Sequence, residues 1–279
     1  MLTTIPIRWP LEAIWQAVEP TLPGFTCEVL PTVESTNTEL MRRFKSRQSA
    51  PVLLVAEQQS AGRGRLGRQW HSQRGGSLTF SIGLPLAPTD WSGLSLAVGV
   101  SLADSLDAVN ATQHRIALKW PNDLWLTQGT TQRKLGGILV ETATFEGQRC
   151  VVIGVGINVR AIAFDAQAST TIAAGCLQDL QPEADVAHTL LRVLPPLVQT
   201  VQAFEQFGFA PFQARFNLRD VLAGRDLQLS DGTCGQAHGV TERGALLVHT
   251  SAGMKEITSS EVTVRPVSGR AFHTDARPC

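Results

Sequence analysis

The segment AGRGRLGRQW, residues 61–70, holds the densest group of side chains that could do chemistry. In it glycines alternate with arginines, and the residues concerned are Gly62, Arg63, Gly64, Arg65, Gly67 and Arg68. Glycines let backbone amides approach an anion closely, and guanidinium groups offer forked donors to phosphate or carboxylate. Trp70 adds an aromatic face that could stack on a purine. The segment therefore indicates an anion-binding loop, with a solvated basic loop as the ordinary alternative.

The same glycines spell GxGxxG, a pattern that also occurs in dinucleotide-binding folds and in protein kinases. A dinucleotide site needs the glycines to open a helix, but here HSQRGGS and an alternating strand follow them. A kinase would place a lysine soon after the loop and would then add HRD and DFG sequences, which this chain lacks. The chain also lacks the GxxxxGKS or GxxxxGKT pattern of a P-loop, so the context excludes all three classes.

Three motifs further along the chain add charged and amide side chains near predicted strands. KWPNDL (119–124) brings a lysine, an amide and a carboxylate together around a proline that fixes the backbone. RKLGGILVE (133–141) places Lys134 before two glycines that permit the close approach of a ligand. VVIGVGINV (151–159) predicts a buried strand over whose bare backbone a ligand could lie. The ordinary interpretations are a turn, an exposed lysine and close strand packing.

Taken in order, ESTNTE (34–39), the arginine-glycine loop and these three motifs resemble the catalytic domain of biotin protein ligases. The resemblance spans about residues 30–160 and extends to the β-rich C-terminal end. It implies that the chain joins the carboxylate of biotin to AMP from ATP, with Mg²⁺ accompanying the nucleotide. The resulting biotinyl-5'-AMP would pass its biotinyl group to one lysine of a partner, the biotin carboxyl carrier protein of acetyl-CoA carboxylase.

The resemblance also implies a set of site residues. Those on the biotin side are Ser35, Thr36, Asn37, Gln59, Gly62, Arg63, Gly64, Arg65 and Lys134. Those on the ATP side are Arg68, Trp70, Lys119, Asn122, Asp123 and Asn158. The implied catalytic residues are Arg65, Lys119 and Lys134, because the reaction needs positive charge where phosphoryl oxygens gain charge. Arg65 would also retain the mixed anhydride, and no metal site made by the protein alone is expected. The segment 35–37 could equally cap a helix, which is compatible with binding biotin.

Two other functions share some of these features. A lipoate or octanoate protein ligase would use the same scaffold and adenylate chemistry, but would lack this run of alternating arginines. A biotin-responsive DNA-binding repressor would carry a helix-turn-helix domain ahead of ESTN, whereas 33 residues precede Glu34 here. We therefore expect the short form of the ligase, without the DNA-binding domain. One local departure is LWLTQGTTQR (124–133), a turn-like stretch longer than the tight hairpin expected in the family.

The elements that must position these residues follow from hydrophobic periodicity. Helices are predicted at 9–19, at 37–45, after Trp91 and at 185–207, where Pro195 and Pro196 must kink or split the helix. Thr36 and Glu39 form a capping-box pattern at the start of the second helix. Strands are predicted at 51–57, 77–84, 115–120, 134–142 and 149–159, with a turn at 146–147 and a loop at 160–184.

These elements predict an α+β protein in which a mixed sheet flanked by helices forms a catalytic domain over residues 1–220. After Leu222, short β-like runs at close spacing predict a small β-barrel over 221–268, followed by a flexible tail over 269–279. The resemblance implies that the larger domain has the class II synthetase-like fold of biotin ligases. It also implies that the barrel is SH3-like.

Composition limits the possible partners and compartments. Lysine and arginine total 24 and balance 24 acidic residues, so net charge gives no argument for nucleic acid or an anionic membrane as a partner. The chain has no apolar run long enough to span a bilayer, and its start does not resemble a secretory signal. The 5 cysteines form no CxxC pair, and the 6 histidines show no metal-ligand spacing. We therefore expect a cytoplasmic protein that binds neither nucleic acid nor membranes.

Overall fold

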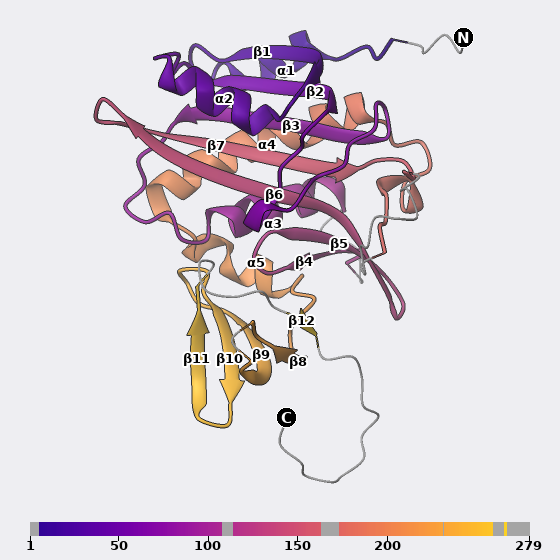
Figure 1. The fold of residues 1–279 in the computed structure, drawn as a ribbon, viewed down its shortest axis with the longest axis vertical. Coiled ribbons are helices and arrows are strands. Elements are labelled where there is room, and N and C mark those ends of the chain that lie inside the picture. The colour runs from indigo at the N-terminus through magenta and orange to yellow at the C-terminus, as the bar shows by residue number, and fades with distance from the viewer. Residues whose placement is uncertain (1–5, 108–113, 163–172, 231, 259–264, 267–279) are drawn as a thin grey trace.

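The computed structural model describes residues 6–107, 114–162, 173–230, 232–258 and 265–266, which form two β-sheets and the helices packed on them (Figure 1). The larger sheet has seven strands in the order β1-β2-β3-β7-β6-β5-β4. It is mixed, because β1 and β2 are parallel while the other neighbours are antiparallel. The predicted α+β class with a mixed sheet is therefore confirmed. The tail predicted at 269–279 and part of the loop predicted at 160–184 lie outside the described residues.

The strands of the larger sheet are β1 (Thr26–Val33), β2 (Val52–Gln59), β3 (Ser77–Pro85), β4 (Ile116–Lys119), β5 (Asp123–Gln128), β6 (Thr131–Phe145) and β7 (Gln148–Asn158). The helices are α1 (Leu11–Val18), α2 (Thr36–Lys45), α3 (Leu94–Leu106), α4 (Val186–Phe207) and α5 (Gln213–Asn217). Short 3₁₀ turns are η1 (Arg65–Gly67), η2 (Leu177–Asp179) and η3 (Ala210–Phe212). None of the helices in the described ranges is long and apolar enough to cross a membrane.

Helices cover both faces of the larger sheet, with α2 on one face and α1, α3 and α4 on the other (Figure 1). Side chains alternate between the two faces along a strand. On β7, Ile153 and Ile157 join the main core with residues of α3 and α4. Val152 packs instead with Leu40 and Phe44 of α2. The even-numbered residues of β7 therefore face the α2 side of the sheet.

Helix α2 is capped one residue earlier than the capping-box pattern predicted. Its N-cap is Ser35, whose Oγ accepts a hydrogen bond from the Thr38 N–H at 3.5 Å. Glu39 does not complete a capping box, because the side chains of Arg42 and Arg43 bind its carboxylate. The hydrogen bond from Arg42 is the main cause that lowers the pKa of Glu39 to about 2. The helix was predicted correctly, but its cap was wrong.

One other prediction about regular structure was wrong, and one was decided in part. The stretch 124–133 is not an extended turn, because its first five residues lie in β5 and its last three begin β6. Of the two alternatives predicted for α4, a split is excluded, since one helix runs through both prolines, and a kink stays a prediction. Leu194, Leu197 and Val198 of α4 are buried, whereas Pro195 and Pro196 lie on its less buried side. The carbonyls that lose a partner at the prolines are thus near solvent, where the loss costs little.

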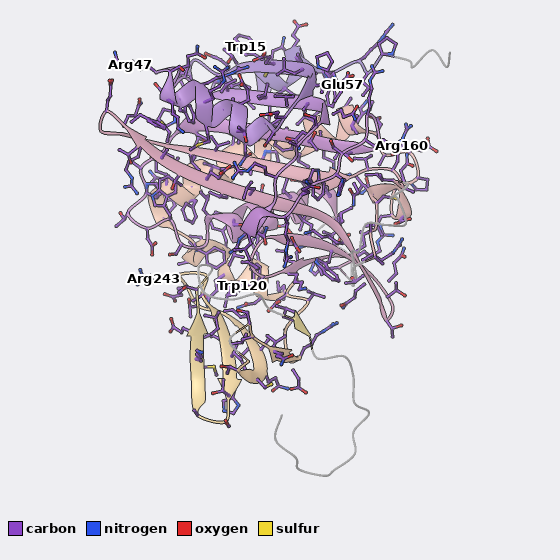
Figure 2. The ribbon with its side chains drawn as sticks, in the orientation of Figure 1. Trp15, Arg47, Glu57, Trp120, Arg160 and Arg243 are labelled. Carbon is purple, nitrogen blue, oxygen red and sulfur yellow. The ribbon has the colours of Figure 1, made fainter. Side chains whose placement is uncertain are left out.

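The predicted C-terminal β-structure is confirmed as a second sheet in the order β11-β10-β9-β8-β12. Its strands are β8 (Asp226–Gln228), β9 (Cys234–Val240), β10 (Leu246–Thr250), β11 (Gly253–Ile257) and β12 (Arg265–Pro266). Within the described part of the chain, no pairing joins β11 to β12 and closes a barrel. Figure 2 places Trp120 and Arg243 where this sheet meets the larger one. The domain boundary between residues 220 and 221 stays a prediction.

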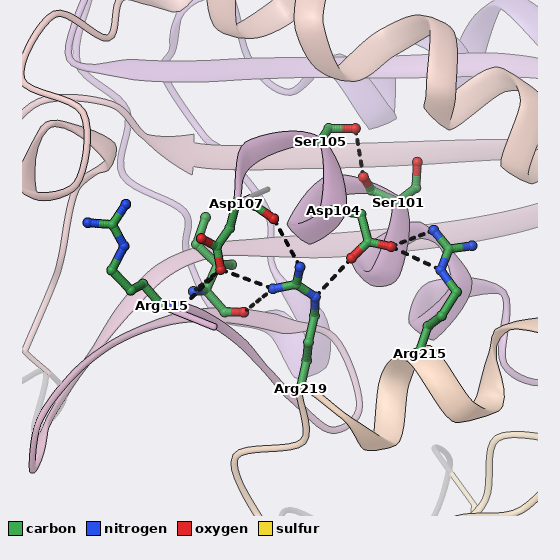
Figure 3. Close-up of polar contacts among 8 residues, drawn as sticks. Ser101, Asp104, Ser105, Asp107, Arg115, Arg215 and Arg219 are labelled. Atoms are coloured by element: carbon green, nitrogen blue, oxygen red, sulfur yellow. Dashed lines mark hydrogen bonds and ion pairs between the residues drawn. The ribbon is translucent and has the colours of Figure 1, made fainter. Parts of the chain in front are cut away.

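A buried arginine fixes the segment that leads into the C-terminal sheet (Figure 3). The Arg219 guanidinium donates to Asp107 Oδ2 at 3.1 Å and to the Asp107 carbonyl at 3.0 Å. It also donates to the Ile116 carbonyl at 2.9 Å and to Asp104 Oδ1 at 2.9 Å. The Arg219 side chain is 2% exposed, whereas Arg215, which also pairs with Asp104, is 50% exposed. This network joins the end of α3, the start of β4 and the end of α5.

The two arginines that share Asp104 should differ greatly in their contribution to stability. Arg219→Ala leaves the buried Asp107 carboxylate without its cation, so we expect a loss of about 3–5 kcal/mol in the free energy of unfolding. Arg215→Ala removes an exposed pair and should cost less than about 1 kcal/mol. Urea denaturation of both variants measures the two losses. Equal losses would show that the burial of Arg219 is energetically unimportant.

Asp220 lies beside this network in a cavity of about 260 Å³ that His114 and Arg225 also line. Its Oδ1 accepts a hydrogen bond from the Leu222 N–H at 2.9 Å, whereas its buried Oδ2 has no hydrogen-bond partner among the residues that the structure describes. Burial is the main cause that raises the pKa of Asp220 from 3.8 to about 6. The folded state therefore holds this proton more tightly than the unfolded chain does.

The raised pKa of Asp220 predicts a pH-dependent effect on stability. Below the pKa that Asp220 has in the unfolded chain, its carboxyl is neutral in both states, and the tighter proton binding of the folded state contributes its full stabilisation. This stabilisation is lost as the pH rises through the pKa of Asp220 in the folded state. Asp220→Asn stays neutral, so at about pH 8 it should be more stable than the natural chain by up to about 3 kcal/mol. The difference should shrink toward about pH 4. Thermal unfolding across this range tests the sign, and a difference that does not vary with pH would contradict it.

Candidate functional site

The middle of the larger sheet carries very short side chains on its α2 side. Gly154 and Gly156 of β7 face this side, and the strand register places Ser81 of β3 and Gly137 of β6 beside them. A Cβ atom at Gly154 would lie 2.1 Å from Asn37 Oδ1, and one at Gly156 would lie 2.4 Å from Trp70 Cε2. Groups from α2 and from the arginine-glycine loop therefore rest directly on the backbone of the sheet. Larger residues at these positions would exclude them.

The start of α2 supplies the first group of polar side chains. The Thr36 N–H and hydroxyl lie 2.8 and 3.2 Å from Gln59 Oε1, at the end of β2. The Asn37 Nδ2 donates to the Leu139 carbonyl at 3.2 Å and to Glu141 Oε2 at 2.9 Å. Ser81 Oγ lies 2.6 Å from both Thr36 Oγ1 and Asn37 Oδ1.

We call this set the amide-hydroxyl group, and its members are Ser35, Thr36, Asn37, Gln59, Ser81 and Glu141. Ser35, Thr36, Asn37 and Ser81 are all buried. Buried hydroxyls and amides keep their hydrogen-bonding geometry because each partner restrains the next. The group can therefore present donors and acceptors to a neutral polar ring, such as a cyclic urea.

The arginine-glycine loop folds back on itself between β2 and β3. The Gly64 N–H donates to the Arg68 carbonyl at 2.7 Å, and the Trp70 N–H donates to the Gly62 carbonyl at 2.9 Å. A Cβ atom at Gly62 would lie 2.3 Å from the Trp70 carbonyl oxygen, so only glycine fits there. At the tip, Leu66 has a φ of 56° and a side chain that is 75% exposed. The loop is thus a narrow hairpin-like turn, which confirms its predicted position between two strands.

Arg63 joins this loop to the amide-hydroxyl group. Its Nη1 lies 3.2 Å from Glu141 Oε1 and 3.4 Å from Thr38 Oγ1. The Arg63 side chain is 52% exposed, so this ion pair lies at the solvent-facing rim of the group. Solvent screening makes the pair weak, which would let the loop move without a large energetic cost.

A second, charged group lies at the junction of β4, β5 and β6. Lys134 Nζ lies 2.7 Å from Asp123 Oδ1, and Gly137 leaves room beside both side chains. Lys119 Nζ lies 4.7 Å from the centroid of the Trp125 ring, in cation-π contact. We call this set the lysine-aspartate group, with the members Lys119, Asp123, Trp125 and Lys134.

Arg65 lies close enough to the lysine-aspartate group for Asp123 to affect its ionisation. Burial lowers the pKa of the Arg65 guanidinium below its ordinary value, and the charge of Arg68 acts in the same direction. The Asp123 carboxylate acts in the opposite direction and partly restores the pKa. Burying a cation beside another cation carries a desolvation cost, which a bound anion would reduce.

The remaining predicted residues have contacts that stabilise the fold. Asn122 Nδ2 donates to the Ile138 carbonyl at 2.8 Å, and Asn158 Nδ2 donates to the Gly175 carbonyl at 3.2 Å. Trp70 packs on Gly156, and its buried Nε1 has no hydrogen-bond partner in the described part of the chain. Arg68 is exposed on the loop, where its carbonyl accepts from Gly64. Of these four residues, Arg68 is the exposed one.

The structure brings most of the predicted residues into the two groups and the arginine-glycine loop between them. The predicted biotin set is divided, because Lys134 pairs with Asp123 of the predicted ATP set. Sequence reasoning missed Ser81, Glu141 and Trp125. Glu141 ends the motif RKLGGILVE, so its polar character within an apolar strand was a usable signal. Ser81 and Trp125 lie in ordinary strand patterns, where nothing in the sequence distinguishes them.

The two groups together suit a reaction between two ligands. One has a neutral polar ring and a carboxylate, and the other is a polyphosphate. The amide-hydroxyl group offers hydrogen bonds, while the lysines and Arg65 offer positive charge for carboxylate and phosphate oxygens. Among the residues described, no three His, Cys, Asp or Glu side chains gather in a way that could hold a metal.

Two family descriptions match the chain in different regions. The Biotin/lipoate A/B protein ligase family matches residues 29–158, which contain both groups and the arginine-glycine loop. The Biotin protein ligase C terminal domain matches residues 227–265, which correspond to the smaller sheet.

Relatives and solved structures of the same kind cover most of the chain. The bifunctional ligase/repressor BirA of Escherichia coli (strain K12) is 34% identical over 252 residues, which are 88% of this chain and 75% of BirA. The biotin–acetyl-CoA-carboxylase ligase of Paracoccus denitrificans is 30% identical over 249 residues, covering 84% of this chain and 98% of that protein. The biotin protein ligase from Aquifex aeolicus in complex with biotin and ATP has a TM-score of 0.71 at 29% identity, covering 86% of this chain and 99% of that one. The chain therefore belongs to the biotin protein ligase family.

Proposed function

We propose that this chain adenylates biotin with ATP and transfers the biotinyl group to a lysine of a carrier protein. The observation that carries the proposal is the position of the arginine-glycine loop, which contacts one polar group of the site and lies within electrostatic reach of the other. Arg63 pairs with Glu141 of the amide-hydroxyl group, while Arg65 is affected electrostatically by Asp123 of the lysine-aspartate group. One loop can thus join two ligands, which is what an adenylation between biotin and ATP requires.

On the biotin side, the amide-hydroxyl group would bind the ureido ring. Thr36, Asn37 and Ser81 form a buried hydrogen-bonded row that can accept and donate in the plane of a cyclic urea. Gln59 and the backbone of Gly62 would complete the pocket, because a Cβ atom at Gly62 would lie 3.0 Å from Gln59 Nε2. The bare backbone of Gly154 and Gly156 lets Asn37 and Trp70 lie against the sheet, where they would flank the bound biotin.

On the ATP side, the lysine-aspartate group would bind the phosphates, with Arg68, Trp70, Asn122 and Asn158 around it. Asp123 offers a carboxylate oxygen, which is the kind of ligand that Mg²⁺ takes together with substrate phosphates. This donor set fits a magnesium ion that arrives with ATP, and such an ion would neutralise phosphate charge. Lys134, now 2.7 Å from Asp123, would then be available to the carboxylate of biotin.

In the first step a carboxylate oxygen of biotin attacks the α-phosphorus of ATP. The bond from this phosphorus to the bridging oxygen breaks, and pyrophosphate leaves with the electron pair. Lys119 and Lys134 would stabilise the charge that grows on the phosphoryl oxygens, and this requires no proton transfer. In the second step the carrier lysine attacks the biotinyl carbonyl as a neutral amine, AMP leaves, and the amine loses its proton to solvent. Arg65 would hold the anhydride between the two steps.

We also propose a protein partner, a cellular compartment and a role for each of the two domains. The carrier would be the biotin carboxyl carrier protein of acetyl-CoA carboxylase, which the name of the Paracoccus denitrificans relative supports. A reaction that consumes ATP fits the cytoplasm, as does the lack of a disulfide between any two described cysteines. Residues 1–220 would carry the chemistry, and residues 221–268 would form the small C-terminal domain.

The proposed function predicts a specific transfer reaction. With ATP, Mg²⁺, biotin and a biotin carrier domain, the purified chain should attach biotin to the carrier lysine, which mass spectrometry of the carrier measures. Octanoate and lipoate should be poor substrates, because the amide-hydroxyl group provides hydrogen bonds that an alkyl chain cannot use. Attachment of octanoate or lipoate in preference to biotin would contradict the proposal.

The role given to Arg65 predicts a leak of the intermediate. Arg65→Gly removes one charge-assisted contact, worth about 1.5–3 kcal/mol, so biotinyl-5'-AMP should leave the site about ten- to a hundredfold faster. Released anhydride should label lysines of a bystander protein, which streptavidin blotting detects. Arg47→Gly is the control, since Arg47 is 79% exposed and pairs with Glu146 in the turn between β6 and β7, at the outer edge of the molecule (Figure 2). If both variants label bystanders equally, Arg65 does not retain the anhydride.

A further inference from the structure

The segment from Lys119 to Asp123 is held from outside the sheet to which it belongs. Leu118, which precedes it, lies in β4, the edge strand of the larger sheet. The Leu118 N–H donates to the Arg219 carbonyl at 2.7 Å, and the Leu118 carbonyl accepts from the Val221 N–H at 3.0 Å. The stretch that leads into the C-terminal sheet therefore covers the open edge of β4 and fixes the residue before Lys119.

On the other side of Lys119, the indole of Trp120 contacts the C-terminal sheet itself. Trp120 Nε1 donates to the Gly244 carbonyl at 3.1 Å. Gly244 lies in the turn between β9 and β10, and Trp120 is 2% exposed. A buried hydrogen bond of this kind holds both groups in place, since breaking it leaves a buried polar atom without a partner.

The turn that carries Gly244 is itself seated on the start of α3. A Cβ atom at Gly244 would lie 2.8 Å from Gly93 Cα, and the residue has a φ of 79°. At the rim, Arg243 Nη2 lies 2.9 Å from Asp90 Oδ2. Figure 2 shows Trp120 and Arg243 at this junction, with Trp15 at the opposite end of the larger sheet. The turn is thus a fixed point against which Trp120 is held.

We propose that Trp120 is a positioning residue, through which the β9–β10 turn sets the place of Lys119 and Asp123 in the site. The proposal rests on the proposed function, in which these two side chains serve the nucleotide. Only three residues separate Lys119 from Asp123, and the strand register pairs these two with each other. A shift of Trp120 therefore moves both Lys119 and Asp123. It also moves the ion pair that Asp123 forms with Lys134.

The C-terminal sheet should affect the use of one substrate, ATP, through Trp120. Among the described residues, the hydrogen bonds of the amide-hydroxyl group join α2, β2, β3 and β6, and none of them involves Trp120 or the β9–β10 turn. The group should therefore keep its geometry when the Trp120 contact is lost. The lysine-aspartate group should lose part of its alignment. The expected signature is a change in the use of ATP without a change in the affinity for biotin.

Trp120→Phe tests this directly, because it removes the N–H donor and keeps an aromatic ring. We expect the ATP concentration that gives half-maximal pyrophosphate release to rise about tenfold, from the loss of one buried hydrogen bond. The affinity for biotin alone, measured by calorimetry, should stay within about twofold of that of the natural chain. Gly244→Ala, which forces the turn away from Gly93 without altering Trp120, should change the ATP requirement in the same direction.

Trp15→Phe is the matched control, because Trp15 Nε1 also donates to a backbone carbonyl, that of Phe25, at 3.1 Å. It should leave both measurements unchanged. Equal ATP requirements in Trp120→Phe and Trp15→Phe would overturn the proposal, and so would an equal weakening of biotin binding and ATP use in Trp120→Phe. If the natural chain itself fails to release pyrophosphate with biotin and ATP, the proposed function fails instead.

Discussion

The site depends on one constraint, the register that places glycines on the α2 side of the central strands. Gly154 and Gly156 alternate onto this side of β7, and β6 brings Gly137 beside Gly156. Because side chains on a strand alternate strictly, a shift of one residue would put apolar side chains of the core where these glycines lie. Asn37 and Trp70 could then no longer rest on the sheet. The start of α2 and the arginine-glycine loop thus take their places from the spacing of a few glycines.

Most charges of the site are paired with each other, and a bound anion would add a further favourable interaction. Each acidic side chain of the site has a cation beside it, Arg63 for Glu141 and Lys134 for Asp123. Arg65 differs from these paired cations, because burial and a neighbouring arginine both lower its pKa. A partly buried cation pays a desolvation cost that one carboxylate does not remove fully, and an anionic ligand would lower it further. The partly buried charge of Arg65 is costly without a ligand, and the same charge favours the binding of an anionic ligand.

The sequence alone predicted the fold class and most strands of the larger sheet, but neither every member of the two polar groups nor the pairings within them. Long apolar strands and amphipathic helices leave periodic patterns, so α2, β2, β6 and β7 were predictable. The strand β5 was missed because only three of its residues are apolar, too few to show a period. The ion pair of Lys134 with Asp123 depends on how β5 and β6 align, including a local shift between Leu124 and Trp125, and no local pattern records that alignment.

The junction with the C-terminal sheet shows why a small domain can matter to chemistry that it does not perform. Its strands are short, and β8 has three residues, so it buries little core and depends on docking for stability. Its buried apolar residues, among them Val240 and Leu246, join the core of the larger domain, and one directional contact, the hydrogen bond from Trp120 to the Gly244 carbonyl, lies within this apolar junction. A buried hydrogen bond tolerates few geometries, because breaking it leaves a polar atom without a partner. The junction therefore fixes an orientation that apolar packing alone would define less well. The residues whose orientation it fixes, Leu118 and Trp120, are the neighbours of Lys119.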